Sequence, residues 1–250
     1  IDLNADVGEG ESTDAELLSI VTSCNIACGG HAGDESSMRD TIVMALRAGV
    51  AIGAHPSYPD AQGFGRRSGF LAGEALYESL TAQVTIFSDI ACELGATMTH
   101  IKPHGALYND AANDPVLADI LARVSDEAHG HVLLIGPPAS ALQVAANDHG
   151  VGFATEGFID RLYTATGALV PRARKDAVHS GIDRVATQAL SIATEHNVIS
   201  EAGASIPLRA DTLCIHGDTP GAVDAARTVR RILESNGIEV AAIDGGGRRG

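Results

Sequence analysis

Short apolar or alternating runs recur along the chain, and longer segments with apolar residues near i, i+3 and i+4 separate them. Runs of the first kind are typical of strands, and the longer pattern is typical of helices that pack by one face. The strand-like runs cover residues 1–6, 24–30, 50–55, 98–105, 131–137, 152–157, 212–218 and 238–244. The helix-like segments cover residues 14–23, 36–49, 72–95, 113–130, 140–150, 182–197 and 222–237.

The alternation of these two kinds of segment predicts an α/β protein with a parallel sheet. Seven or eight βα units without an obvious linker favour a single domain, residues 1–250, built as a closed or nearly closed barrel. A doubly wound open sheet is the alternative. Helix ends support these boundaries, because Asp114-Pro115 is a favourable helix start and Gly49 is a favourable helix end.

Two segments depart from the alternating pattern. Residues 157–180 have weak periodicity and carry two arginine-rich turns, which predicts a long irregular loop. Loops of this length are usually functional. The glycine-rich residues 245–250 are expected to form a flexible tail.

The composition narrows the class of protein. Hydrophobic residues make up 45% of the chain but aromatic residues only 4%, so the core must be built from Ala, Val, Ile and Leu. A formal net charge of -15 disfavours binding to nucleic acid or to an anionic membrane surface. No apolar run approaches the length of a membrane span, and no charged segment followed by an apolar one marks a signal peptide. We therefore expect a cytoplasmic protein.

The four cysteines show no CxxC or paired-knuckle spacing, which argues against a zinc finger and against a dithiol redox site. Cys24, Cys28 and Cys214 lie in apolar runs. They are expected to be buried free thiols in a reducing compartment.

Polar residues occupy one face of several predicted strands. In THIKPHGALY, residues 99–108, His100, Lys102 and His104 take alternate positions. The corresponding faces of three other strands carry Asp2, Asn4 and Asp6; Ala51, Gly53 and His55; and Thr212, Cys214, His216 and Asp218. If the apolar faces meet the helices, these faces point into the barrel, where polar groups are costly unless they bind one another or a ligand. The pattern predicts a pocket built from several strand ends.

A structural interpretation of the same residues competes with the functional one. A histidine at a strand end commonly forms a hydrogen bond that only stabilises the fold. Lys102 could form an ion pair with Asp2 or Asp6 inside the barrel. In the functional interpretation, Lys102 polarises a carbonyl group or holds an anion.

Carboxylate and imidazole side chains could supply a metal site with mixed nitrogen and oxygen ligands. The candidates are Asp6, Glu9, His31, Asp34, His55, His104, His216 and Asp218. Their spacing matches neither HExxH nor another compact ligand motif, so the sequence leaves a protein-bound metal undecided. The same groups without a metal would form a general acid and base pair.

Arginines beside glycines are candidate anion-binding groups. Arg66 and Arg67 lie in GFGRR, residues 63–67, and Arg172 follows a proline in the irregular loop. Planar guanidinium groups suit phosphate or carboxylate. The motifs GxxxxGK[ST] and GxSxG do not occur, and no GxGxxG opens a helix after a strand, so neither a Walker-type nucleotide site nor a serine hydrolase is supported.

Six segments together resemble the LamB/YcsF family. They are DLNADVGEG at 2–10, NIACGGHAGD at 25–34, GAHPSYPDAQGFGRR at 53–67, KPHGALYND at 102–110, EGFIDRLYTATGALVPR at 156–172 and HGDTPGAV at 216–223. The resemblance implies a distorted TIM-like barrel of the glycoside hydrolase/deacetylase type. It also implies a hydrolase that opens the cyclic amide 5-oxoproline to glutamate with ATP and Mg²⁺, together with separate subunits B and C. Which of the subunits binds the ATP is left open.

The implied chemistry suggests roles for the residues. Phosphorylation of the lactam carbonyl oxygen would give an anionic intermediate, which cationic side chains would stabilise. The residues expected to be catalytic are Asp6 or His104, which would activate water, and Lys102 and His216, which would stabilise the oxyanion or phosphate. Arg66 and Arg161 are expected to hold the substrate carboxylate or phosphate. The residues expected to bind substrate are in full Asn4, Asn25, His31, His55, Arg66, Arg67, Tyr108, Glu156, Arg161 and Asp218.

One position departs from related barrels. The opening NADVGE is similar to the Asn-Ala-Asp-Asp start of metal-dependent deacetylases, but Val7 stands in place of their second carboxylate. Two other functions stay open. One is a stand-alone metal-dependent deacetylase or amidohydrolase with His55 and His104 as ligands. The other is a non-catalytic subunit that binds a lactam.

Overall fold

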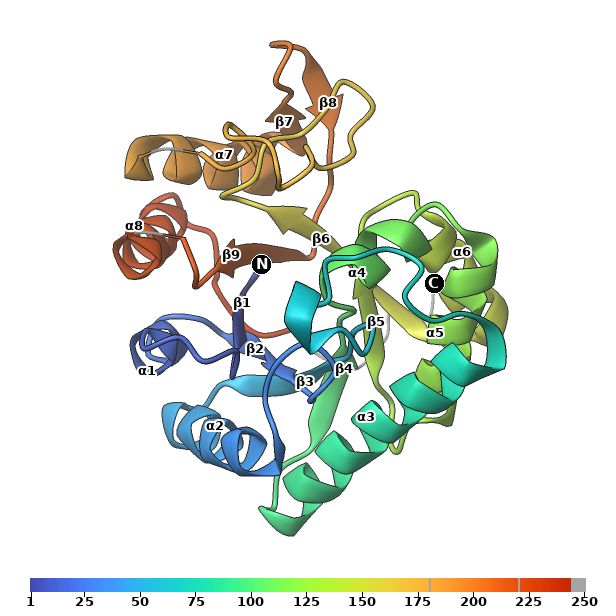
Figure 1. Ribbon diagram of the computed structural model, residues 1–250. Coiled ribbons are helices and arrows are strands. Elements are labelled where there is room, and N and C mark those ends of the chain that lie inside the picture. Colours follow the sequence, from blue (N-terminus) through green and yellow to red (C-terminus); the bar gives the residue numbers. More distant parts are fainter. Residues whose placement is uncertain (180, 220, 244–250) are drawn as a thin grey trace.

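Seven parallel strands form a closed barrel with helices around its outside (Figure 1). The computed structural model describes residues 1–179, 181–219 and 221–243. The barrel strands, in their order around the sheet, are β1 (Asp2–Val7), β2 (Ser23–Ala27), β3 (Ala51–His55), β4 (Met98–Ile101), β5 (Leu133–Gly136), β6 (Gly152–Phe158) and β9 (Thr212–His216). The TIM-like barrel expected from the sequence is confirmed, and the open sheet is excluded.

All but one of the described helices match a predicted segment, the first of them only in part, whereas the helix at Gly105–Ala111 was not predicted. They are α1 (Asp14–Leu18), α2 (Glu35–Ala48), α3 (Gly73–Glu93), α4 (Gly105–Ala111), α5 (Pro115–Glu127), α6 (Ala141–His149), α7 (Ile182–Glu195) and α8 (Ala222–Ser235). Asp114 caps α5 with Pro115 in its first turn, and Gly49 ends α2 in the left-handed conformation, as predicted. Among the described residues no helix is long and apolar enough to cross a membrane.

The prediction of an eighth barrel strand at residues 238–244 is wrong. β9 pairs with both β1 and β6, so the barrel closes with seven strands and leaves no edge for another. Of this segment, residues 238–243 are described, and they contain no strand. They pass the start of β1 instead, where the Ile1 amino group donates to the Glu239 carbonyl at 2.7 Å and the Ala241 amide donates to the Ile1 carbonyl at 3.0 Å. The predicted tail, residues 245–250, lies outside the described residues.

The structure also differs from the predicted elements at the carboxyl end of β4 and after α7. The predicted strand 98–105 ends at Ile101, and the short helix α4 begins at Gly105. After α7, the antiparallel pair β7 (Asn197–Ile199) and β8 (Ser205–Pro207) lies outside the barrel (Figure 1). A short 3-10 turn, η1 (Ala61–Gly63), follows β3. The described part of the predicted loop 157–180 has no helix or strand after β6 ends at Phe158.

The two faces of β1 show how the barrel separates apolar from polar side chains. Leu3, Ala5 and Val7 are fully buried and belong to the main hydrophobic core. Asn4 and Asp6 lie on the opposite face and hydrogen-bond side chains from other strands. Val7 therefore takes part in the core, so a carboxylate at this position would lose its hydration among apolar side chains.

Candidate functional site

Lys102 lies at the centre of a polar group inside the barrel. Its Nζ is 2.9 Å from Asp6 Oδ1, 2.9 Å from Glu156 Oε1 and 3.1 Å from Cys214 Sγ. Burial alone would lower the pKa of Lys102, but Asp6, Cys214 and Glu156 outweigh it and raise the pKa well above the usual value. Lys102 is therefore a cation held between two buried carboxylates.

Two asparagines fix the carboxylates around this cation. Asn25 Nδ2 donates to Asp6 Oδ1 at 2.9 Å and to Asn4 Oδ1 at 2.8 Å. Asn4 Nδ2 in turn donates to Glu156 Oε1 at 3.1 Å. Asp2 does not join the ion pair suggested from the sequence, because its carboxylate accepts from Thr22, Ser23 and Thr212. Amide groups of fixed orientation thus hold Lys102, Asp6 and Glu156, which we call the Lys102 centre, in place.

His100 plays a structural part in this group. Its Nε2 lies 2.8 Å from Asn25 Oδ1, and its Nδ1 lies 2.9 Å from the Thr99 hydroxyl. Burial, together with the Lys102 charge, lowers the pKa of His100 to about 3, so the ring is neutral and its Nε2 donates to Asn25. Gly53 makes room for this ring, because a Cβ there would meet His100 Nε2 at 2.2 Å.

A second group lies next to the Lys102 centre and consists of Glu9, His31, His55 and His104; we call it the histidine cluster. One atom from each member lies within 4.8 Å of one atom from every other. The Glu9 carboxylate accepts from His31 Nε2 at 2.9 Å. The rings of His31 and His104 are stacked, with centroids 3.6 Å apart and an interplanar angle of 2°.

Backbone carbonyls orient two of the imidazole rings. His55 Nδ1 lies 2.7 Å from the Lys102 carbonyl oxygen, and His104 Nε2 lies 3.0 Å from the Phe64 carbonyl oxygen. The remaining ring nitrogens, His55 Nε2 and His104 Nδ1, face each other at 3.0 Å. Asp6 links the cluster to the Lys102 centre, because its Oδ2 is 3.4 Å from His55 Nε2.

The pKa of His31 and that of Glu9 are lowered within the cluster, whereas Asp6 outweighs the effect of burial and raises the pKa of His55. Burial, together with the neighbouring histidines, lowers the pKa of His31 to about 4. For Glu9, burial would raise the pKa, but its contacts with the His104 and His31 rings outweigh it and hold the pKa well below the usual value. A carboxylate oxygen beside imidazole nitrogens is a set of ligands suited to a metal ion.

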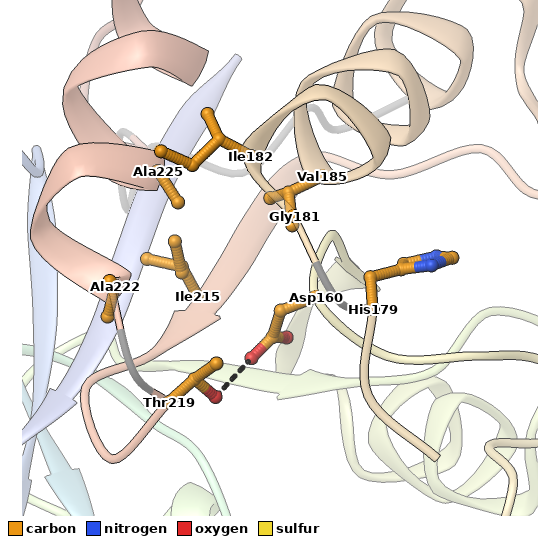
Figure 2. Close-up of a pocket in the computed structure, with 10 residues that line it drawn as sticks. Asp160, His179, Gly181, Ile182, Val185, Ile215, Thr219, Ala222 and Ala225 are labelled. Atoms are coloured by element: carbon orange, nitrogen blue, oxygen red, sulfur yellow. Dashed lines mark hydrogen bonds between the residues drawn. The ribbon is translucent and has the colours of Figure 1, made fainter. Parts of the chain in front are cut away.

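His216 is held by a carboxylate that the sequence reasoning missed. Asp160 accepts from His216 Nδ1 at 2.9 Å and from the His216 backbone amide at 3.2 Å. Burial would raise the pKa of Asp160, but the charge and hydrogen bonds of His216 lower it overall. Asp160 also points toward Thr219, which donates to it at 3.5 Å, beside a cavity of about 60 Å³ (Figure 2). Asp160 fixes the orientation of the His216 ring.

Two arginines meet at Asp218 on the loop that follows β9. Arg66 Nη2 lies 3.1 Å from Asp218 Oδ2, and Arg172 Nη2 lies 2.5 Å and 2.6 Å from the two carboxylate oxygens. Arg66 comes from the loop after β3 and Arg172 from the loop after β6. Two separate loops thus bring half-exposed guanidinium groups to Asp218 on a third loop. These guanidinium groups are suited to an anionic ligand.

Three of the candidate residues have other partners. Arg67 is bound to Asp60 within its own loop. Arg161 donates to the carbonyl oxygens of Ala177 and Val170, so it holds together the loop that follows β6. Asp34 accepts from the Ser37 amide in a capping box at the start of α2 and is not among the members of the histidine cluster.

Tyr108 lies on α4, buried against the ring of Phe158. Within the described residues, its hydroxyl and Glu156 Oε2 are buried and have no hydrogen-bond partner. Burial, with the neighbouring Glu156 carboxylate, raises the pKa of the Tyr108 hydroxyl well above the usual value. A buried donor and a buried acceptor without partners, close to Lys102, are available to a ligand.

Sequence reasoning missed Asp160 and did not show which partners three other site residues would have. Asp160 follows Glu156 and Phe158 at alternate positions, so a longer reading of that strand would have found it. Cys214 was on the predicted inward face but was taken only as a buried thiol, and all four cysteines are free. Glu9 and Arg172 were noted, but nothing in their spacing indicated which residues they would meet.

These observations define the class of protein as a parallel (β/α) barrel with a buried polar site at the carboxyl ends of its strands. The model of the LamB/YcsF family matches residues 1–246, and the chain belongs to this family. The chain is 43% identical over 247 residues to the A subunit of 5-oxoprolinase from Bordetella parapertussis, covering 97% of this chain and 98% of that protein.

One solved structure supports the family assignment, and a second shares the fold. The lactam utilization protein from Thermus thermophilus superposes with a TM-score of 0.90 at 35% identity, covering 97% of this chain and 99% of that one. A family 4 carbohydrate esterase from Streptomyces lividans superposes with a TM-score of 0.51 at 9% identity, covering 98% and 93% of the two chains. The second likeness concerns the fold alone.

Proposed function

We propose that this chain is the A subunit of a 5-oxoprolinase and that it takes part in ATP-dependent hydrolysis of 5-oxoproline to glutamate with subunits B and C. The names of its relatives support the substrate and the subunit role. In the net reaction, water adds to the lactam carbonyl carbon, the ring C–N bond breaks, and the ring nitrogen becomes the amino group of glutamate. ATP is cleaved to ADP and phosphate in the same cycle, which consumes a second water.

The observation that carries this proposal is the position of Lys102 between Asp6 and Glu156, inside the barrel. An amide is a poor electrophile, so ring opening requires stabilisation of negative charge on the carbonyl oxygen or on a phosphoryl group attached to it. A fixed ammonium group in a water-poor site supplies that stabilisation strongly. Lys102 is therefore the electrophilic group in the proposed reaction.

The neighbours of Lys102 have complementary roles. Asp6 faces Lys102 with Oδ1, which leaves Oδ2 free of that contact. Asp6 Oδ2 takes the proton of the attacking water. His104 is a weaker candidate for this role because its Nε2 lies on the Phe64 carbonyl and its Nδ1 faces His55 Nε2 within the histidine cluster. The unpartnered Glu156 Oε2 accepts the lactam N–H, and the Tyr108 hydroxyl donates to the substrate.

Charged groups at the mouth of the barrel complete the site. Arg66 and Arg172, which share Asp218, bind the substrate carboxylate or the transferred phosphate. His216, oriented by Asp160, stabilises the developing oxyanion with Lys102. ATP and Mg²⁺ enter this proposal as co-substrates, and subunits B and C are the alternative place for binding them. The four free cysteines support a reducing compartment such as the cytoplasm.

The test is glutamate release from 5-oxoproline with ATP and Mg²⁺, measured for the chain alone and for the chain with subunits B and C. We expect release only from the complete mixture, with one ADP formed for each glutamate. A nucleotide-binding titration on each separate subunit then locates the ATP. Absence of release from the complete mixture, with every subunit folded, would contradict the proposal.

The histidine cluster favours a second candidate, a stand-alone metal-dependent amidohydrolase or deacetylase. The burial of Val7 in the core weighs against it. This candidate is distinguished by turnover of N-acetylated substrates by the chain alone.

The third option, a lactam-binding subunit without catalysis, predicts that 5-oxoproline still binds after Asp6→Asn and that this variant leaves turnover of the complete mixture unchanged.

A further inference from the structure

Three electron-rich atoms of the histidine cluster face one another. Because His55 Nδ1 donates to the Lys102 carbonyl and His104 Nε2 donates to the Phe64 carbonyl, the lone pair of each ring in its neutral form lies on the other nitrogen. Those two nitrogens, His55 Nε2 and His104 Nδ1, are 3.0 Å apart. The Glu9 carboxylate lies beside both. Such atoms repel one another unless a cation lies among them.

The spacing of the three atoms suits a metal ion. Glu9 Oε1 is 3.3 Å from His104 Nδ1 and 3.8 Å from His55 Nε2. Nitrogen and oxygen ligands lie about 2.0–2.2 Å from a zinc ion, so neighbouring ligand atoms are about 3.0–3.5 Å apart. One point close to the plane of these three atoms therefore lies at coordination distance from all of them. A proton could join only two of the atoms.

The ring orientations divide the histidines into ligands and a supporting residue. The rings of His55 and His104 are almost perpendicular, at 88°, so their lone pairs can converge on one point. The rings of His31 and His104 are parallel, so their lone pairs cannot converge in the same way. His31 donates to Glu9 through Nε2 instead. Hydrogen bonds of this kind from outside the ligand set orient metal ligands and are typical of metal sites.

We propose that Glu9, His55 and His104 bind one divalent transition-metal ion of the Zn²⁺ class, with His31 holding the Glu9 carboxylate in position. Two imidazoles and one carboxylate leave further coordination positions for water or substrate. Asp6 Oδ2, 3.4 Å from His55 Nε2, borders the same space. A water bound there would lose its proton more readily, which would make Asp6 an adequate base. The inference concerns ion binding and does not depend on the proposed lactam hydrolysis.

The experiment measures ion binding by the full chain without any substrate. The purified chain is stripped with a chelator and titrated with Zn²⁺ by calorimetry, and its ion content is measured by mass spectrometry. Co²⁺ replaces Zn²⁺ in a parallel sample, where its visible absorption reports the number and kind of ligands. We expect one ion per chain and a Co²⁺ spectrum typical of mixed nitrogen and oxygen ligands.

Variants locate the ion. Glu9→Gln and His104→Ala are expected to abolish stoichiometric binding, whereas His31→Gln is expected to weaken it by about 10–100-fold. His149→Ala is the matched control, because His149 lies at the end of α6, where its ring hydrogen-bonds Asp119. Glu9→Gln keeps the shape of the side chain, so it remains informative if His104→Ala fails to fold. Circular dichroism checks the fold of each variant.

Two results would overturn the inference. One is a wild-type chain that binds no Zn²⁺ or Co²⁺ at micromolar concentrations. The other is binding that Glu9→Gln and His149→Ala reduce equally, which would show that the ion sits elsewhere. Neither result bears on glutamate release by the complete mixture of subunits, so this inference and the proposed function can fail separately.

Discussion

The ammonium nitrogen of Lys102 lies 2.9 Å from Asp6 Oδ1, with both side chains buried in the barrel. The two residues are 96 positions apart in the chain. Their contact joins β1 to the segment that follows β4, and Glu156 adds a third strand on the other side of the cation. The same interaction therefore contributes to the closure of the barrel and to the proposed chemistry.

Lys102→Met is expected to abolish glutamate release by the complete complex and to destabilise the chain. Removal of the cation leaves Asp6 and Glu156 as buried carboxylates without a counter-charge, which costs about 3–5 kcal/mol for a broken buried pair. Turnover and the free energy of unfolding in urea measure the two effects. Lys175, the only other lysine, is exposed, and Lys175→Met is the control. Lys102→Met with normal turnover would exclude the electrophilic role.

Arg66→Gln and Arg172→Gln are each expected to raise the KM for 5-oxoproline, with a smaller effect on kcat. Loss of a hydrogen bond to a charged group costs about 1.5–3 kcal/mol, or roughly 10–150-fold in binding. Steady-state kinetics of the complete complex separate KM from kcat. Arg67→Gln is a matched control from the same loop, since Arg67 binds Asp60 instead. An equal effect of all three variants would show that Arg66 and Arg172 do not bind the substrate.

Asp160→Asn is expected to reduce turnover, because the amide can no longer fix the His216 ring as the carboxylate does. Stability should also change with pH. Since the pKa of Asp160 is lowered in the folded chain, its contribution to stability is present above the ordinary carboxyl pKa and is lost as the pH falls through the lowered value.

The measurement for Asp160→Asn is urea unfolding of both proteins at neutral pH and at about pH 3, below the ordinary carboxyl pKa. The stability difference between wild type and variant should be larger at neutral pH and should shrink in acid. A difference that is the same at both pH values would show that the Asp160 charge adds nothing to stability.

Gly53→Ala is expected to destabilise the chain by about 1–3 kcal/mol, the usual cost of overpacking. The new methyl group would overlap the His100 ring and displace it from Asn25. Thermal unfolding measures the loss. The double variant Gly53→Ala/His100→Ala should lose less stability than the sum of the single variants, because the overlap is gone. Strict additivity would mean that the two residues do not interact.

Asp34→Ala should cost about 1 kcal/mol of stability through loss of the helix cap, and Asp34→Ser should retain most of it. Asp34 was a candidate metal ligand on sequence grounds, but in the structure it caps α2. Zn²⁺ binding by Asp34→Ala should therefore equal that of the wild-type chain. Weaker binding would place Asp34 among the ligands.

The sequence by itself determined the α/β class and the polar faces of several strands. Periodicity is a local property, so alternation in residues 1–6 already separated Asn4 and Asp6 from Leu3 and Ala5. It failed at residues 238–243, where an apolar run resembles a strand although closure by β9 leaves it no partner. Strand count depends on closure, which involves residues far apart in the chain.

Only the tertiary structure decided which of these polar residues meet. Nothing in their spacing distinguished Asp6 from Asp2 as the partner of Lys102, or showed that Arg66 shares Asp218 with Arg172 while Arg67 binds Asp60. The backbone carbonyl groups of Lys102 and Phe64 orient His55 and His104. Because every residue has a backbone carbonyl group, no sequence motif identifies these two. Side-chain pairing across a barrel is set by strand register and loop path, and these follow from packing of the whole chain.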